Sequence, residues 1–109
     1  MPSKMLKIPR LKSKLLALLV LISASGLSHA ADPNKGADLY ALHCATCHGV
    51  AGISVMLGAP NFAKNEGLMK PDEDLLVSIK NGKAAMPSYR GILNDQEILN
   101  VIAYLRTLN

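Results

Sequence analysis

Apolar residues recur every three or four positions in three segments of the chain, and irregular stretches rich in Gly and Pro separate these segments. This period is typical of amphipathic helices with one buried face. It predicts helices over about 33–45, 71–80 and 95–107. No run alternates apolar and polar residues in the manner of a half-buried strand, so the pattern indicates an all-α domain.

Local signals support the ends of the second and third helices. Pro71 suits a first helical turn, and the acidic run 72–74 complements the positive end of the helix dipole. Gly82 is expected to end this helix in a left-handed conformation. Asn94 and Glu97 have the spacing of a capping box at the start of the last helix.

The first 30 residues differ in composition from the rest of the chain. An apolar run over 15–22 precedes Ser28-His29-Ala30, and the basic residues before it are Lys4, Lys7, Arg10, Lys12 and Lys14. This order is typical of a secretory signal peptide. We expect cleavage after Ala30, which leaves residues 31–109 as one domain. A retained membrane anchor is the alternative, although the apolar stretch is shorter than the roughly 20 residues of a spanning helix.

Removal of this segment would change the sign of the net charge. The full chain has 12 Lys and Arg against 8 Asp and Glu, a formal charge of +4. Five of the basic residues and none of the acidic ones lie in the first 30, so the remaining domain carries a formal charge of −1. Because this domain has no basic run with interleaved aromatic residues, a nucleic-acid partner is not expected.

The sequence Cys44-Ala45-Thr46-Cys47-His48 is the pattern of covalent attachment of a c-type haem. Two thiols three residues apart can reach the two vinyl groups on one edge of a porphyrin, and the His that follows can offer a nitrogen to the iron. A domain over 31–109 is also near the size at which side chains alone make a marginal core. A covalently held haem would therefore stabilise the fold as well.

Three other interpretations of the two cysteines stay open. A thiol–disulfide redox pair normally lies beside a βαβ pattern, which this sequence does not show. A zinc site needs four ligands, and the chain offers two Cys and three His, of which His29 is expected to leave with the signal peptide. A structural disulfide would suit an exported protein, although so short a loop would strain it.

A haem iron has a second axial position, for which the predicted domain offers Met56, Met69 and Met86. His43 lies too close to the attachment site to reach the opposite ring face. Met86 is the best candidate, because it precedes Pro87 in a stiffened loop between two predicted helices. Met56 and Met69 remain alternatives, and Met is also a common filler of gaps in protein cores.

From Asn34 to Asn109 the chain resembles a small bacterial class I cytochrome c. The segments that carry the likeness are Gly36-Ala37-Asp38-Leu39-Tyr40, Cys44 to His48, Gly82 through Met86-Pro87-Ser88-Tyr89, and Ile98 through Tyr104-Leu105. The resemblance implies a cytochrome c fold, in which three to four short helices pack around one covalently attached haem. The first and last helices would cross, with Gly36 and Tyr40 meeting Tyr104 and Leu105. A frayed first turn is the other explanation for a Gly inside a helix.

The resemblance also implies residue roles. His48 would be the proximal ligand and Met86 the distal one, on a haem c held by Cys44 and Cys47. Pro60 would place its carbonyl at the far nitrogen of His48, although Gly58-Ala59-Pro60-Asn61-Phe62 departs from the family's common Gly-Pro-x-Leu element. The pocket walls would be Phe62, Ile79, Tyr89 and Leu93.

Met ligation raises the reduction potential of the iron and closes both axial positions. The sequence therefore predicts a periplasmic one-electron carrier, not an enzyme, that docks briefly with a donor and an acceptor redox protein and works as a monomer. The basic residues that could steer an acidic partner, or be ordinary solvated charges, are Lys64, Lys70, Lys80, Lys83 and Arg90. Two alternatives remain: a haem subunit retained in a larger oxidoreductase complex, and a five-coordinate haem protein with gas-binding or peroxidase activity.

Overall fold

The computed structural model describes residues 3–4 and 29–109. The chain divides after Ala30, and the unit Ala31–Asn109 contains every element described below. Most of the expected signal peptide, including its apolar run, lies outside the described residues, so its cleavage stays a prediction. In the part of the chain that the structure describes, no helix is both long and apolar enough to span a bilayer.

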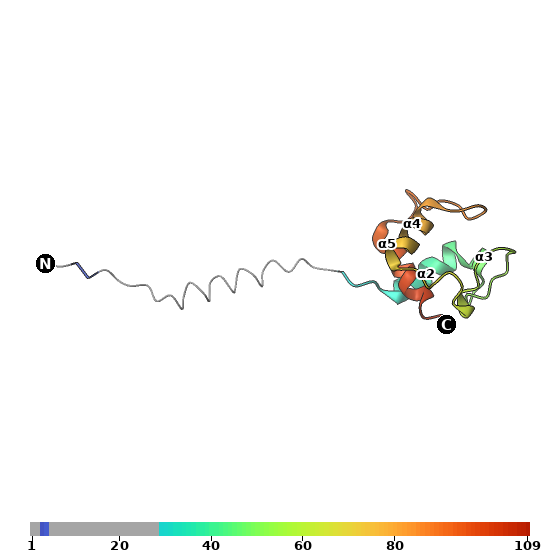
Figure 1. The fold of residues 1–109 in the computed structure, drawn as a ribbon, viewed down its shortest axis with the longest axis horizontal. Helices are drawn as coiled ribbons and strands as arrows, with labels where there is room; N and C mark the ends of the chain where they lie inside the picture. The colour runs from blue at the N-terminus through green and yellow to red at the C-terminus, as the bar shows by residue number, and fades with distance from the viewer. Residues whose placement is uncertain (1–2, 5–28) are drawn as a thin grey trace. The chain divides into compact units, whose positions relative to one another are not determined.

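The unit is all-α, as the sequence predicted (Figure 1). Its α-helices are α2 (Pro33–His43), α3 (Ala45–His48), α4 (Asp72–Asn81) and α5 (Asp95–Leu105), and η1 (Phe62–Lys64) is a short 3-10 helix. The three predicted helices end within two residues of their observed ends. The sequence analysis missed α3 and η1, which are too short to show a helical period. Among the described residues, the one β-type pairing is an isolated bridge between Lys83 and Met86.

Side-chain caps fix where α2 and α5 begin. Asn94 Oδ1 accepts a hydrogen bond from the Glu97 amide at 2.9 Å, and Glu97 Oε2 accepts one from the Asn94 amide at 2.8 Å. This is the predicted capping box of α5. The carboxylate of Asp32 caps α2 by accepting from the amides of the two residues that follow Pro33. Gly82 ends α4 as predicted and has a positive φ of 72°, but its ψ of 169° lies outside the left-handed helical region, so the predicted left-handed cap is wrong in that detail.

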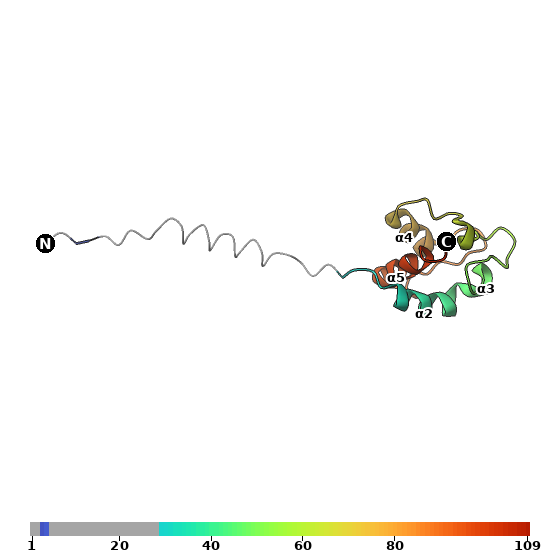
Figure 2. The same ribbon diagram turned by 90° about the horizontal axis from the view of Figure 1, so that it is seen from below.

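The first and last helices of the unit cross at close range (Figure 2). A Cβ on Gly36 would lie 1.9 Å from the carbonyl oxygen of Asn100, so only Gly allows the two backbones to approach this closely. Tyr40 is buried beside this point, and its ring lies 5.2 Å from that of Tyr104 in a tilted arrangement. The close-approach explanation of Gly36 is therefore right, and the frayed turn is wrong.

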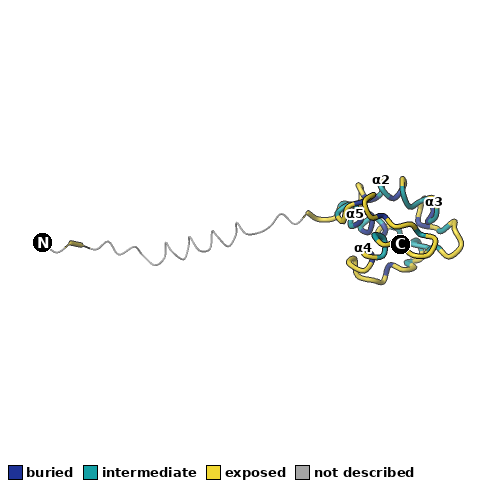
Figure 3. Tube along the Cα trace, turned by 90° about the horizontal axis from the view of Figure 1, so that it is seen from above, coloured by how far each residue is buried: buried dark blue, intermediate teal, exposed yellow. Residues whose placement is uncertain are grey.

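The core is centred on α5, whose inward residues Ile98, Val101, Ile102 and Leu105 are buried. Figure 3 shows buried segments on the inner sides of the helices and exposed loops around them. Just after α5, Arg106 holds the segment before α4 in place. Its guanidinium donates to the carbonyls of Leu68 and Lys70 at 2.8 and 2.9 Å and pairs with Asp72.

Candidate haem site

One side of the unit contains a cavity of about 420 Å³. All four α-helices contribute to its walls, together with the loops over 56–60 and 83–89. Its walls are mainly apolar and include Leu68, Leu75, Ile79, Met86, Val101 and Leu105. The helix packing therefore leaves an apolar space of the kind that a bound cofactor fills.

Both cysteines face this cavity and are free and half-buried. Cys44 lies at the break between α2 and α3, and the amide of His48 closes the following turn on the Cys44 carbonyl at 3.0 Å. This single turn brings both thiols to the cavity wall. Burial, followed by the charge of Cys47, raises the pKa of the Cys44 thiol to about 11. Over residues 3–4 and 29–109, no three His, Cys, Asp or Glu side chains gather in a way that could hold a metal ion.

His48 is buried, with an exposed fraction of 8%, and lines the same cavity. Its Nδ1 lies 3.3 Å from the carbonyl oxygen of Pro60, which is the contact that the family resemblance implied. A carbonyl can only accept, so this hydrogen bond requires the proton on Nδ1. The tautomer leaves the lone pair of Nε2 available for a metal.

The Pro60 carbonyl owes its position to the short helix η1. The Asn61 side chain caps η1, the Asn61 amide donates to Glu66 at 2.7 Å, and the Phe62 amide donates to the Gly52 carbonyl at 2.8 Å. The Phe62 ring stacks on the His48 imidazole, with centroids 4.5 Å apart and planes inclined by 21°. Phe62 was predicted as a pocket wall, but the sequence analysis did not foresee this stack.

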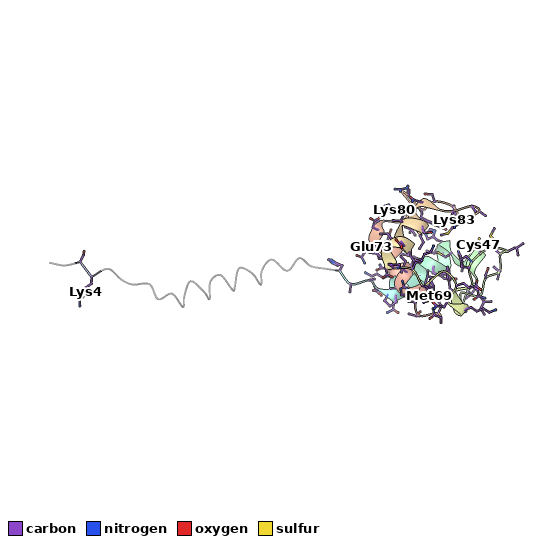
Figure 4. The ribbon with its side chains drawn as sticks, viewed as in Figure 1. Lys4, Cys47, Met69, Glu73, Lys80 and Lys83 are labelled. Carbon is purple, nitrogen blue, oxygen red and sulfur yellow. The ribbon has the colours of Figure 1, made fainter. Side chains whose placement is uncertain are left out.

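The structure separates the three candidate methionines. Met86 and Met56 both line the cavity; Met86 is half-buried, whereas Met56 is 39% exposed. Met69 is absent from the lining and 84% exposed, and its sulfur accepts a hydrogen bond from Asn65. Figure 4 labels Cys47 and Lys83, which both line the cavity, and Met69, which does not. Met69 is therefore not placed to reach a group in the cavity.

The backbone around Met86 is tightly folded against the end of α4. Lys83 and Met86 exchange two backbone hydrogen bonds of 3.1 and 3.0 Å across a turn in which Ala84 has φ 53°. A Cβ on Gly82 would lie 2.7 Å from the Met86 carbonyl oxygen, so Gly permits this packing. The Ser88 hydroxyl donates to the Lys80 carbonyl at 2.8 Å.

Tyr89 connects this loop to the attachment motif. Its hydroxyl donates to the carbonyl of His43, the residue before Cys44, at 2.7 Å. Its ring lies edge-on to the His43 ring, with centroids 5.9 Å apart. Burial, followed by the charges of the two cysteines, raises the pKa of the Tyr89 hydroxyl. Tyr89 thus joins the two chain segments that carry Cys44 and Met86.

The structure changes two further parts of the predicted site. Leu93 is buried in the core but does not line the cavity, so its assignment as a pocket wall is wrong. Met56 and Leu57 do line it, although the sequence analysis named neither as a wall. The apolar run 55–57, in a segment without charged residues, was a usable signal for them.

Comparison with known proteins gives a consistent result. A family model described as "Cytochrome C oxidase, cbb3-type, subunit III" matches residues 31–105. A cytochrome c6 from Thermosynechococcus vestitus is 34% identical over 94 residues, covering 83% of this chain and 82% of the relative. A cytochrome c6 from a Synechococcus strain is 36% identical over 98 residues, covering 84% and 86%.

Solved structures agree with these sequence matches. A structure of cytochrome c6 from the diatom Phaeodactylum tricornutum superposes with a TM-score of 0.61 at 28% identity, covering 71% of this chain and 93% of the other. Another, described as a c-type cytochrome, gives 0.62 at 31% identity, covering 68% and 96%. The all-α fold, the crossing terminal helices and the C-x-x-C-H turn on an apolar cavity define a class I cytochrome c. The chain belongs to the cytochrome c family, as a monohaem member similar to cytochrome c6.

The residues present fit the haem c of this family. Two free thiols one turn apart lie on the wall of an apolar cavity, and a buried His with its Nε2 lone pair available follows them directly. Membership of the family therefore assigns one haem c, attached covalently through Cys44 and Cys47.

Proposed function

We propose that this protein is a periplasmic one-electron carrier whose haem iron is bound by His48 and Met86. The observation that carries the proposal is that both side chains line the cavity that also holds the two attachment thiols. A haem supplies reversible one-electron chemistry, and a thioether ligand favours its reduced form. If His48 and Met86 both bind the iron, no coordination site would be left for a substrate.

The surrounding residues hold both proposed ligands in position. The Pro60 carbonyl fixes the His48 tautomer, and hydrogen-bonded partners of this kind make a ligating His a better donor. The turn at Lys83–Met86 and the Tyr89 hydroxyl hold the methionine loop against the cavity. A rigid apolar surround needs little rearrangement when the charge in the site changes, which suits rapid electron transfer.

Ligand assignment can be tested by substitution of single methionines. In Met86→Ala, covalent haem is expected to remain while the reduced protein gains carbon monoxide binding that the wild type lacks. Met56→Ala is the matched control, because Met56 lines the same cavity and should leave the iron closed. If instead Met56→Ala opens the iron and Met86→Ala does not, Met56 is the distal ligand. Carbon monoxide binding by the wild type would favour the five-coordinate alternative.

The loop after the attachment motif is the proposed docking surface for redox partners. Val50, Ile53, Val55 and Leu57 are exposed there, and no charged residue occurs from Gly49 to Ala63. The same loop lines the cavity through Met56 and Leu57. Exposed apolar patches commonly mark interaction sites, and weak electron-transfer complexes bury small interfaces. We infer brief apolar docking by a monomer, with the lysines as ordinary solvated charges.

Export through a cleaved signal peptide completes the proposal. The supporting observation is the order of basic, apolar and small residues before Ala31. The mass of the protein recovered from the periplasm should equal residues 31–109 plus one haem. A product that retains residues 1–30 and sediments with membranes would show an uncleaved anchor instead.

A haem subunit within a larger complex is the second candidate, because the matching family model is described as an oxidase subunit. Size-exclusion chromatography of the native periplasmic fraction separates the two. A free carrier elutes as a small coloured species, whereas a subunit co-elutes with larger redox proteins.

A further inference from the structure

The face of the His48 imidazole is covered by an aromatic ring, in addition to the hydrogen bond at its edge. Phe62 lies nearly parallel to it, with centroids 4.5 Å apart and planes inclined by 21°. The hydrogen bond from Nδ1 to the Pro60 carbonyl is 3.3 Å long, beyond the usual 2.7–3.2 Å range for such bonds. A long contact at one atom leaves the imidazole plane free to tilt, whereas a parallel ring restrains the plane itself.

We propose that Phe62 is a positioning residue that sets the plane of the His48 imidazole, and therefore the orientation in which this ligand meets the haem iron. The inference rests on the proposed function, because it takes His48 as an axial ligand. Pro60 and Phe62 come from one short segment, so one piece of backbone holds both the edge and the face of the imidazole.

Phe62 can act in this way because its own position is fixed. Its amide donates to the Gly52 carbonyl at 2.8 Å, and a Cβ on Gly52 would lie only 3.1 Å from the Cβ of Phe62. The Tyr40 ring also meets the Phe62 ring edge-on, with centroids 6.5 Å apart and planes inclined by 64°. Tyr40 is 1% exposed, and its hydroxyl donates to the carbonyl of Gly49, the residue after His48, at 2.6 Å.

The restraint on His48 thus begins at the helix crossing. Tyr104 packs on Tyr40, Tyr40 on Phe62, and Phe62 on His48, with ring centroids at 5.2, 6.5 and 4.5 Å. Tyr40 and Tyr104 belong to α2 and α5, the most closely packed pair of helices in the unit. The orientation of the imidazole is therefore tied to the close crossing of α2 and α5.

The test compares oxidised, haem-loaded proteins by proton NMR and by electron paramagnetic resonance. In a low-spin ferric haem, the orientation of an axial imidazole controls how unpaired spin is distributed over the ring methyl groups. Phe62→Leu keeps an apolar side chain but removes the flat face, and Phe62→Tyr keeps the face. We expect Phe62→Leu to change the pattern of haem methyl shifts and the g-anisotropy, and Phe62→Tyr to retain the wild-type pattern.

A matched control separates positioning from loss of stability. Leu93→Ala removes a buried core side chain that does not line the cavity, so it should destabilise the protein and leave the methyl shifts unchanged. Wild-type shifts in a folded Phe62→Leu protein would overturn the inference and leave the proposed function intact. A wild-type protein with no low-spin His signature would overturn the proposed ligation itself.

Discussion

Where α2 crosses α5, the contact is made by backbone and fully buried side chains, whereas the loop over 83–90 is held by individual hydrogen bonds. At the crossing, Gly36 brings two backbones together, and Ile98 and Ile102 are completely buried. In the loop, Ser88 binds Lys80, and Tyr89 reaches across to His43. Substitutions in the first region should therefore act on global stability, and those in the second on access to the site.

The largest expected effect is at the crossing. Gly36→Ala places a methyl group 1.9 Å from the Asn100 carbonyl oxygen, so the helices must separate. We expect a loss of about 3 kcal/mol in the free energy of unfolding. Gly91→Ala is the control: its φ of 76° is unfavourable for Ala, but nothing lies within 4 Å of the new Cβ. Denaturant unfolding that gave equal losses for both would contradict the close-approach argument.

A smaller effect at the same crossing depends on pH. Burial, followed by the charges of Cys44 and Tyr104, raises the pKa of Tyr40 from 10.0 to about 12. The unfolded chain loses this proton first, so the stabilising contribution is complete below pH 10 and is lost as the pH rises through about 12. In the haem-bound protein, burial still raises the pKa of Tyr40. Chemical denaturation at a series of pH values should show a fall in this window that is weaker in Tyr40→Phe.

In the loop, Tyr89→Phe should change the access of external ligands to the haem iron more than it changes the stability of the fold. It removes the hydrogen bond to the His43 carbonyl, a loss of about 1 kcal/mol. If that energy holds the methionine loop closed, an external ligand such as imidazole should enter the ferric iron about fivefold faster. Stopped-flow mixing measures this rate. A lower unfolding midpoint with no change in the rate of imidazole entry would mean that Tyr89 contributes to stability alone.

The smallest expected change in stability is a gain, not a loss. Ala84 has φ 53°, a conformation that costs a residue with a Cβ about 1 kcal/mol. Ala84→Gly should relieve this strain, offset in part by the greater freedom of Gly when unfolded, for a net gain of about 0.5 kcal/mol. Thermal unfolding of the haem-bound proteins can detect the change. Loss of stability would indicate that the turn is not strained.

The ionic-strength dependence of electron transfer tests how the two surfaces around the site are used. The loop over 49–63 has no charged residue, whereas Lys70 and Lys83 also line the cavity. Apolar docking predicts a transfer rate to a partner that changes little with added salt. Val55→Asp should slow it more than Lys83→Gln does. A steep fall with salt would assign docking to the lysines.

The sequence predicted the parts of this protein that repeat or have a fixed spacing. The helical period gave α2, α4 and α5, the capping box gave the start of α5, and the C-x-x-C-H spacing gave the attachment site. It could not give α3, because four residues make a single turn with no period to detect. The Tyr89 bond to His43 joins residues 46 positions apart, and the stack of Phe62 on His48 depends on a 3-10 turn. Contacts of these kinds follow from tertiary packing, which local patterns do not encode.

The order of the elements along the chain also bears on how the protein is made. Helix α2 packs against α5, the last helix of the unit. Arg106 follows α5 in the chain, so its hydrogen bond to the segment before α4 can form only when α5 is present. If the chain is exported from its amino end, as proposed above, Cys44 and Cys47 cross the membrane before the residues of α5 do. The thiols are then accessible to the machinery of thioether formation while the domain is still open, and folding afterwards encloses the finished adduct.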